Sequence, residues 1–227
     1  MGIKIYKNIN DINSIKAFIF DLDGTLIDTE KIYHIVWPIT MREMGYELPE
    51  ERFLKMRSLG RPYAPRQFKE WYGEDFDYDG ARRIRKGHFD AYVAEHGIQL
   101  KKGTIELLEF LKDHHITTAI ATATDLNRAL EYTDMVGITK YFDRIISATM
   151  VDEGKPSPKV YQYAANELGL NPSECIAVED APNGVLSAFR AGLNTIMVPD
   201  LSMPDEELLK TMHIQADSLL DIMNLFV

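Results

Sequence analysis

The sequence predicts an α/β fold, in which helices cover a Rossmann-like parallel sheet and a small α-helical domain is inserted after the first strand. From residue 104 onward, short apolar segments alternate with amphipathic helical segments, which is typical of parallel strands joined by right-handed crossovers. Residues 32–100 instead show helical spacing and many aromatic side chains, without a buried-strand pattern. We therefore expect a sheet domain from residues 1–31 and 101–227, and a helical domain from residues 32–100.

The first core strand is expected at residues 17–20, which are all apolar. A strand of this kind is buried on both faces, as in the centre of a parallel sheet. It is followed by Asp21-Leu22-Asp23-Gly24-Thr25, so two carboxylates lie at its carboxyl end, where ligands bind in open α/β sheets. Taken alone, Asp-x-Asp-Gly is equally compatible with a surface turn.

Residues 1–15 give little structural information, and their polar side chains discourage regular structure: Asn8, Asn10, Asp11 and Asn13. A helix is expected at residues 32–44, where Gly45 provides the C-terminal cap and Pro38 predicts a kink or a break. Further helices are expected between residues 49 and 97. Their aromatic side chains should form the core of the helical domain: Phe53, Phe68, Trp71, Tyr72, Phe89 and Tyr92.

The remaining elements follow in alternation. Helices are expected at residues 104–113, 125–136 and 181–191, and another from Ser157, as the N-cap with Pro158 in the first turn, to Gly169. Strands are expected at residues 116–122, 144–148, 175–178 and 195–198.

Composition excludes several classes of protein. The chain has 227 residues and a formal charge of −10, which disfavours nucleic-acid and anionic-membrane partners. A signal-peptide pattern and a membrane-spanning apolar run are both missing from the sequence, so we expect a soluble, cytoplasmic protein. The single cysteine, Cys175, lies in an apolar segment and is expected to be a buried, unreactive thiol. A monomer is expected, although the sequence does not determine the oligomeric state.

Three other predicted strands also end in residues suited to phosphate or metal chemistry. Thr122 and Ala123 follow one strand and offer a hydroxyl group and backbone N–H groups to a phosphate. Lys155 lies in a loop framed by prolines, although an isolated loop lysine is usually solvated. Glu179 and Asp180 directly follow a buried strand, and a bound cation explains two adjacent acids there better than coincidence does.

Taken together and in this order, four segments resemble the four motifs of the haloacid dehalogenase superfamily of phosphotransferases: Asp21-x-Asp23-Gly24-Thr25, Thr122, Lys155-Pro156 and Glu179-Asp180. The inserted helices and the Gly-Lys-Pro-x-Pro segment resemble, more narrowly, the β-phosphoglucomutase-like branch with a helical cap. The resemblance covers residues 16 to about 200. It implies an enzyme that uses Mg²⁺ and acts on a small phosphorylated metabolite.

The resemblance also implies a role for each motif. Asp21 is the expected nucleophile, because a carboxylate is normally ionised at neutral pH and needs no general base. Asp23 is expected to protonate the leaving oxygen and later to activate the water. Thr122 and Lys155 complete the catalytic group, and four residues are expected to bind the phosphate: Gly24, Thr122, Ala123 and Lys155. The expected Mg²⁺ ligands are Asp21, Asp23 through its backbone carbonyl, Glu179 and Asp180.

The expected activity is hydrolysis of a sugar phosphate through an aspartyl-phosphate intermediate. A β-phosphoglucomutase-type mutase is the alternative, and a non-catalytic phosphate-binding interaction protein is a remote one. Two departures from the mutase pattern favour hydrolysis. Tyr33 occupies the position of the mutase hinge histidine, with His34 one residue along, and Arg61 directly follows Gly60 instead of standing three residues after a glycine.

Substrate contacts from the helical domain are expected from five residues: Tyr33, His34, Arg61, Arg66 and His88. Other basic residues of this domain could face either the cleft or the solvent: Arg82, Arg83, Arg85 and Lys86. The paired residues His114 and His115 are expected at a solvated helix end, so zinc is not expected. The domain should close over the strand ends about hinges near residues 30–32 and 100–103.

Overall fold

A single mostly parallel sheet organises the computed structural model, which describes residues 2–9 and 12–226. Within these residues seven strands pair in the order β1-β7-β6-β5-β2-β3-β4, and only the β1–β7 pair is antiparallel. The strands are β1 (Ile3–Ile5), β2 (Ala17–Phe20), β3 (Thr117–Thr122), β4 (Arg144–Ser147), β5 (Cys175–Glu179), β6 (Asn194–Met197) and β7 (Ile214–Ala216). The predicted α/β class is confirmed.

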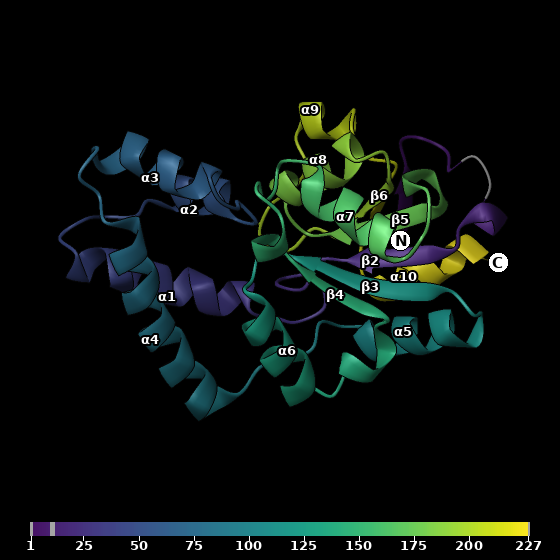
Figure 1. Cartoon of the computed structure of the whole chain (residues 1–227), viewed down its shortest axis with the longest axis horizontal. Coiled ribbons are helices and arrows are strands. Elements are labelled where there is room, and N and C mark those ends of the chain that lie inside the picture. Colours follow the sequence, from purple (N-terminus) through teal and green to yellow (C-terminus); the bar gives the residue numbers. More distant parts are fainter. Residues whose placement is uncertain (1, 10–11, 227) are drawn as a thin grey trace.

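Helices cover both faces of this sheet. In Figure 1, α7 and α8 lie above the sheet and α5 lies below it. Helix α10 contacts α5. The helices of the sheet domain are α5 (Thr104–Asp113), α6 (Leu126–Met135), α7 (Lys159–Glu167), α8 (Pro182–Arg190), α9 (Glu206–Leu209) and α10 (Leu219–Ile222). Short 3₁₀ turns occur at Ile12–Ser14, Thr139–Tyr141, Ala148–Met150, Pro172–Glu174 and Met223–Phe226.

The central strand β2 is buried on both faces, as predicted. Because side chains alternate along a strand, Phe18 and Phe20 pack in one cluster with Leu108 of α5. Ile19 packs on the opposite face with Ala164 of α7. Neighbouring β5 begins with Cys175 in the same buried layer, where burial raises the pKa of its thiol to about 12. The expected burial of Cys175 is thus confirmed.

Four helices form a unit beside the sheet, at the left of Figure 1. They are α1 (Glu30–Glu43), α2 (Glu50–Met56), α3 (Tyr63–Tyr72) and α4 (Tyr78–His96), and residues 30–96 are called the helical unit below. The predicted aromatic core is present, because Phe53, Phe68 and Phe89 are buried and the other expected aromatic residues pack against them. The helical unit occupies the segment for which the sequence predicts a separate domain.

Three local predictions were wrong. The break expected at Pro38 does not occur, since helix α1 runs from Glu30 to Glu43 through the proline, with Trp37 and Met41 buried on either side of it, and a kink there stays a prediction. Helix α7 begins at Lys159 with Pro158 as the N-cap residue, so Ser157 does not cap it.

The third wrong prediction concerns the N-terminal segment, where Ile3–Ile5 form β1 despite the expected lack of regular structure. This strand depends on pairing with β7, which lies more than 200 residues away in the sequence, so local composition cannot reveal it. Asn10 and Asp11 lie outside the described residues.

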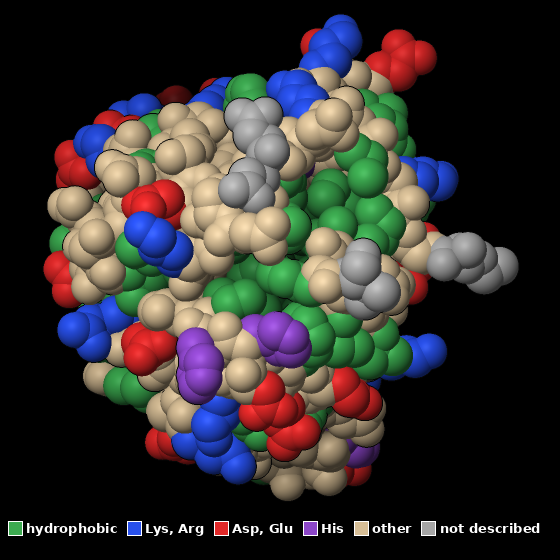
Figure 2. Space-filling model, turned by 90° about the vertical axis from the view of Figure 1, so that its right-hand side faces the viewer, with side chains coloured by type: hydrophobic (Ala, Val, Ile, Leu, Met, Phe, Trp, Pro, Cys, Tyr) green, Lys and Arg blue, Asp and Glu red, His purple; other side chains and the backbone are tan. Residues whose placement is uncertain are grey.

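The end of the molecule opposite the helical unit has a mixed surface. Figure 2 shows hydrophobic side chains gathered in the middle of this face, with acidic, basic and histidine side chains around them. Both His114 and His115 are exposed, as expected. In the described part of the chain, the helices are too short or too polar to cross a membrane.

Candidate active site

The register of the central strands brings the predicted site residues to one edge of the sheet. Strand β2 lies between β3 and β5, with Phe20 opposite both Ile120 and Val178. The next residue, Asp21, donates its backbone N–H to the carbonyl oxygen of Val178 at 2.9 Å. Asp21 therefore emerges beside Glu179, which follows Val178.

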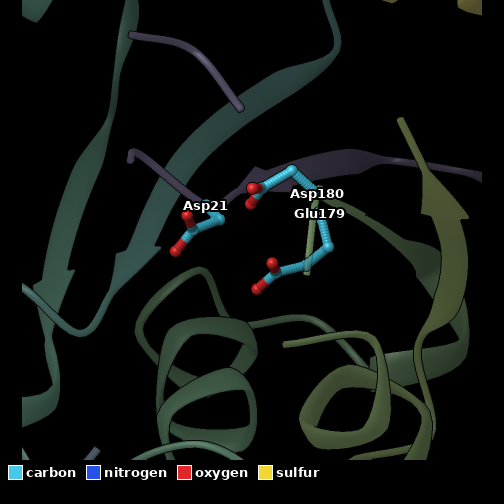
Figure 3. Close-up of side chains that lie close together, drawn as sticks. All are labelled: Asp21, Glu179 and Asp180. Atoms are coloured by element: carbon cyan, nitrogen blue, oxygen red, sulfur yellow. The ribbon is translucent and has the colours of Figure 1, made fainter. Parts of the chain in front are cut away.

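Three carboxylates converge at this edge. Figure 3 shows Asp21, Glu179 and Asp180 around a common space, and one oxygen from each lies within 4.8 Å of the other two. All three side chains are buried. Among the described residues, Asp21 Oδ2 and Glu179 Oε2 have no hydrogen-bond partner. Buried carboxylate oxygens without donors are unfavourable, and an all-oxygen set suits a hard divalent cation, so these residues fit Mg²⁺.

Lys155 neutralises two of these carboxylates from a fully buried position. Its Nζ lies 2.5 Å from Asp21 Oδ1 and 2.5 Å from Glu179 Oε1. The hydroxyl of Tyr161 also donates to Glu179 Oε1, at 2.6 Å. Burial alone lowers the pKa of Lys155, but the two carboxylates raise that pKa above its ordinary value. Lys155 is therefore a permanent buried cation and not a solvated loop lysine.

Burial changes the pKa values of two of these carboxylates, Asp21 and Asp180. Burial raises the pKa of Asp21 well above its ordinary value, and although Lys155 opposes this change, the Glu179 and Asp23 carboxylates add to it. Burial likewise raises the pKa of Asp180 well above its ordinary value, against the opposing charge of Arg57. A cation among these carboxylates would lower both pKa values, because an opposite charge favours the ionised form.

Asp23 is held separately from the cluster by hydroxyl groups. Thr29 donates to Asp23 Oδ1 at 2.6 Å, and Thr124 donates to Asp23 Oδ2 at 2.7 Å. The Thr122 hydroxyl lies 3.5 Å from the same Oδ2. These contacts fix the orientation of a buried carboxylate.

Two glycines leave room for carboxylates of this cluster. Gly24 has φ +86°, and a Cβ there would lie 2.3 Å from Asp180 Oδ2. A Cβ at Gly184, in the first turn of α8, would lie 2.0 Å from Glu179 Oε1. Gly24 thus admits a carboxylate, and its contact with phosphate remains a prediction.

A cavity of about 350 Å³ separates the sheet edge from the helical unit. The predicted residues that line it are Asp21, Asp23, Tyr33, Arg61, Thr122 and Ala123. Its other cationic residues are Arg57, Arg82, Arg85 and Arg128. Four predicted residues do not line it: Gly24, Lys155, Glu179 and Asp180.

Three predicted substrate contacts lie outside this cavity. His34 pairs with Glu50 at 2.6 Å, and His88 pairs with Glu43 at 2.9 Å. Arg66 is also absent from the lining residues. Consecutive side chains on a helix point about 100° apart, so His34 does not share the direction in which Tyr33 faces the cavity.

Comparison with known proteins identifies the family. The sequence model of haloacid dehalogenase-like hydrolases matches residues 15–192. The chain belongs to this family. Hexitol phosphatase A of Escherichia coli (strain K12), a relative, is 35% identical over 183 residues, which cover 81% of this chain and 82% of the relative. Protein CbbY of Cereibacter sphaeroides is 32% identical over 216 residues, which cover 91% of this chain and 92% of that protein.

A solved structure shares the fold of this haloacid dehalogenase-like hydrolase. The crystal structure of CbbY from Rhodobacter sphaeroides in complex with xylulose-(1,5)bisphosphate has a TM-score of 0.77 and 28% sequence identity. The match covers 91% of this chain and 95% of that chain. The predicted family and the hydrolase class are therefore confirmed.

Several residues of this haloacid dehalogenase-like site escaped sequence reasoning. Thr29 and Thr124 bond to Asp23, and both lie next to motif residues, so proximity in the sequence was a usable signal. Tyr161 gave no signal beyond an apolar helix face. Arg57 gave none either, because it is one of many basic residues in the helical unit. Its guanidinium nevertheless contacts Asp180 and Glu30.

Proposed function

We propose that the protein is a Mg²⁺-dependent phosphatase that hydrolyses a small sugar phosphate through an aspartyl phosphate on Asp21. The observation that carries this proposal is the convergence of Asp21, Glu179 and Asp180, with two oxygens lacking partners among the described residues, beside the buried ammonium of Lys155. The names of the relatives support a sugar-type substrate, because one is a hexitol phosphatase and another binds a sugar bisphosphate.

The metal site would use Asp21, Glu179 and Asp180, and the family resemblance adds the backbone carbonyl of Asp23. When bound, Mg²⁺ supplies positive charge that offsets the repulsion between the nucleophilic carboxylate and the phosphate. Lys155 supplies a second positive charge, 2.5 Å from Asp21 Oδ1.

The chain's own residues account for the proton and phosphoryl transfers. An oxygen of Asp21 forms a bond to phosphorus while the bond from phosphorus to the leaving oxygen breaks. Asp23 gives its proton to that leaving oxygen, and then accepts a proton from the water that attacks the aspartyl phosphate. Phosphate leaves, and the Asp21 carboxylate is restored. Thr29 and Thr124 keep Asp23 in place through both steps.

The cavity supports a small, anionic substrate. Its volume of about 350 Å³ suits a metabolite, and arginines line its walls. The net charge of the chain would repel a polyanion such as a nucleic acid, so a compact phosphate ester that reaches these arginines is favoured.

Hydrolysis is favoured over mutase chemistry by Tyr33. Its ring packs against Phe89 with centroids 4.7 Å apart, and burial raises the pKa of its phenol above the ordinary value. A phenol of this kind cannot exchange protons near neutral pH as an imidazole does. Among the described residues that line the cavity there is no histidine.

Phosphate release from a panel of compounds tests the proposal. Sugar phosphates, sugar bisphosphates and nucleotides are incubated with the purified protein in Mg²⁺ and in EDTA. We expect release from a sugar phosphate that EDTA abolishes and Mg²⁺ restores. A protein that binds phosphate but releases none from the whole panel would be the non-catalytic alternative. Isomerisation of β-glucose 1-phosphate, primed with bisphosphate, that far outpaces phosphate release would favour the mutase.

A further inference from the structure

Arg57 links the helical unit to the carboxylate cluster. It follows helix α2 and is only 3% exposed. Its Nη2 donates to Asp180 Oδ2, and its Nε donates to Glu30 Oε2 at 2.9 Å. Its Nη1 donates to Ser202 Oγ at 3.0 Å. A cation of the helical unit therefore reaches a carboxylate that the proposed metal needs.

The buried charges are divided between two cations. Lys155 pairs with Asp21 and Glu179, whereas Asp180 takes its positive charge from Arg57. Because an unpaired buried charge is strongly unfavourable, the guanidinium of Arg57 compensates the charge of Asp180. A divalent cation at the same carboxylate would face the guanidinium at short range, and the two positive charges would repel each other.

Asp200 offers a second carboxylate acceptor near the guanidinium of Arg57. The Oδ2 atom of Asp200 is buried and has no hydrogen-bond partner within the described part of the chain. It lies 3.8 Å from Arg57 Nη2, which is too long for a hydrogen bond but close enough for a small movement. The other oxygen, Asp200 Oδ1, already accepts from Lys101 at 2.8 Å. Asp200 is therefore held in place with one free acceptor facing the guanidinium.

The backbone of Arg57 is fixed independently of its side chain. The Nδ2 atom of Asn183, in the first turn of α8, donates to the carbonyl oxygens of Arg57 at 2.8 Å and of Lys55 at 3.1 Å. A move of the guanidinium from Asp180 to Asp200 thus needs only side-chain rotation, and the helical unit keeps its contact with the core.

We propose that Arg57 is a positioning residue that competes with the metal for Asp180 and so sets the metal affinity of the site. The inference rests on the proposed function, because it requires the metal to bind the carboxylate cluster. When the metal binds, Arg57 Nη2 exchanges Asp180 Oδ2 for Asp200 Oδ2. Arg57 therefore lowers the affinity of the metal-free site for Mg²⁺.

Calorimetric titration of the metal-free protein with Mg²⁺, without substrate, tests this competition. Arg57→Gln should bind Mg²⁺ about tenfold more tightly than the wild type, whereas Arg57→Lys, which keeps the charge, should stay close to it. Arg52→Gln is the matched control, because Arg52 lies in α2, just before Arg57, but stacks on Trp71 and Tyr72. A gain of affinity is informative, since structural damage would weaken binding.

A variant of the alternative acceptor, Asp200, tests the same exchange of Arg57 between two carboxylates. Asp200→Asn removes the charge of the alternative acceptor, so Arg57 should stay on Asp180 and Mg²⁺ should bind more weakly. Equal or weaker binding in a folded Arg57→Gln variant, or unchanged binding in Asp200→Asn, would overturn the competition while leaving the proposed phosphatase intact. A wild-type protein that binds no Mg²⁺ would instead contradict the proposed metal dependence, and the competition with it.

Discussion

Glu30 shows how burial and a neighbouring guanidinium together set the charge of one side chain. Burial raises the pKa of the Glu30 carboxyl from an ordinary value of 4.5 to about 7, and the charge and hydrogen bond of Arg57 only partly oppose this. The residue is 6% exposed and lines the cavity beside Asp23. Its protonation therefore changes in the neutral range, where most carboxylates remain ionised.

This raised pKa predicts a pH-dependent stability. The folded state binds the Glu30 proton more tightly than the unfolded state does, so the protonated carboxyl stabilises the folded protein. This contribution to the free energy of unfolding is complete below pH 4.5 and is lost as the pH rises through about 7. Relative to Glu30→Gln, the metal-free wild type should lose roughly 3 kcal/mol of unfolding free energy across this range. Urea unfolding at several pH values measures the difference, with the exposed Glu51→Gln as control. A difference that stays constant with pH would refute the prediction.

Residues of the site differ in how visible they are in the sequence. Asp21 and Glu179 could be located because each directly follows an apolar strand segment, and parallel strands end at one edge. Lys155 could be placed only through the family resemblance, since a loop lysine alone carries no such signal. The contact of Arg57 with Asp180 joins residues 123 positions apart, and no local pattern encodes it.

At the scale of elements, prediction succeeded where burial leaves a continuous pattern. Helix α5 has the predicted bounds at Thr104–Asp113, and β3 and β5 differ from prediction by one residue. The strands β1 and β7 were not predicted, because each has three residues and is too short to show a period of two. The edge strand β1 is held by pairing with β7, and β7 also pairs with β6.

Helix α8 provides a prediction at this scale, because its first turn packs directly on Glu179. Gly184→Ala should push the Glu179 carboxylate out of the cluster, since the new Cβ would lie 2.0 Å from its Oε1. We expect weaker Mg²⁺ binding and at least a tenfold loss of turnover. Metal titration and steady-state kinetics measure both effects.

Gly87→Ala is the matched control, because Gly87 is also helical but a Cβ there would meet no atom within 4 Å. That change should leave turnover alone and stabilise α4 by about 0.5–1 kcal/mol, as alanine does relative to glycine within a helix. Wild-type metal affinity in Gly184→Ala would show that α8 does not position Glu179.

At the scale of the whole molecule, the helical unit lies closed against the core. The backbone N–H of Gly60 donates to the carbonyl oxygen of Lys155 at 2.8 Å, and that of Gly154 donates to Arg61 at 2.7 Å. The two connections to the core also pair with each other, through a bridge between Ile27 and Leu100. The insertion point was visible in the sequence, but this closed contact was not, because it consists of backbone groups from distant segments.

The loop around Gly154 lies close to the loop around Gly60, so a methyl group added at Gly154 should push the two loops apart. In Gly154→Ala, the new Cβ would lie 2.9 Å from the Cα of Gly60, so the loops must separate. We expect faster amide hydrogen exchange in residues 58–64 and 152–157 and a higher KM, because a less closed unit holds the substrate less well. Gly87→Ala again serves as the control. Exchange rates equal to those of the wild type would argue against closure through this contact.

The central claim, that Asp21 carries the phosphoryl group, is tested most directly by trapping the intermediate. The enzyme is mixed with Mg²⁺ and the best sugar phosphate from the panel, quenched in acid within the first turnover, digested and analysed by mass spectrometry. We predict a phosphoryl adduct on the peptide that contains Asp21, lost in Asp21→Asn together with several orders of magnitude of turnover. An adduct on another residue, or an Asp21→Asn variant that retains turnover within about tenfold of the wild type, would contradict the account.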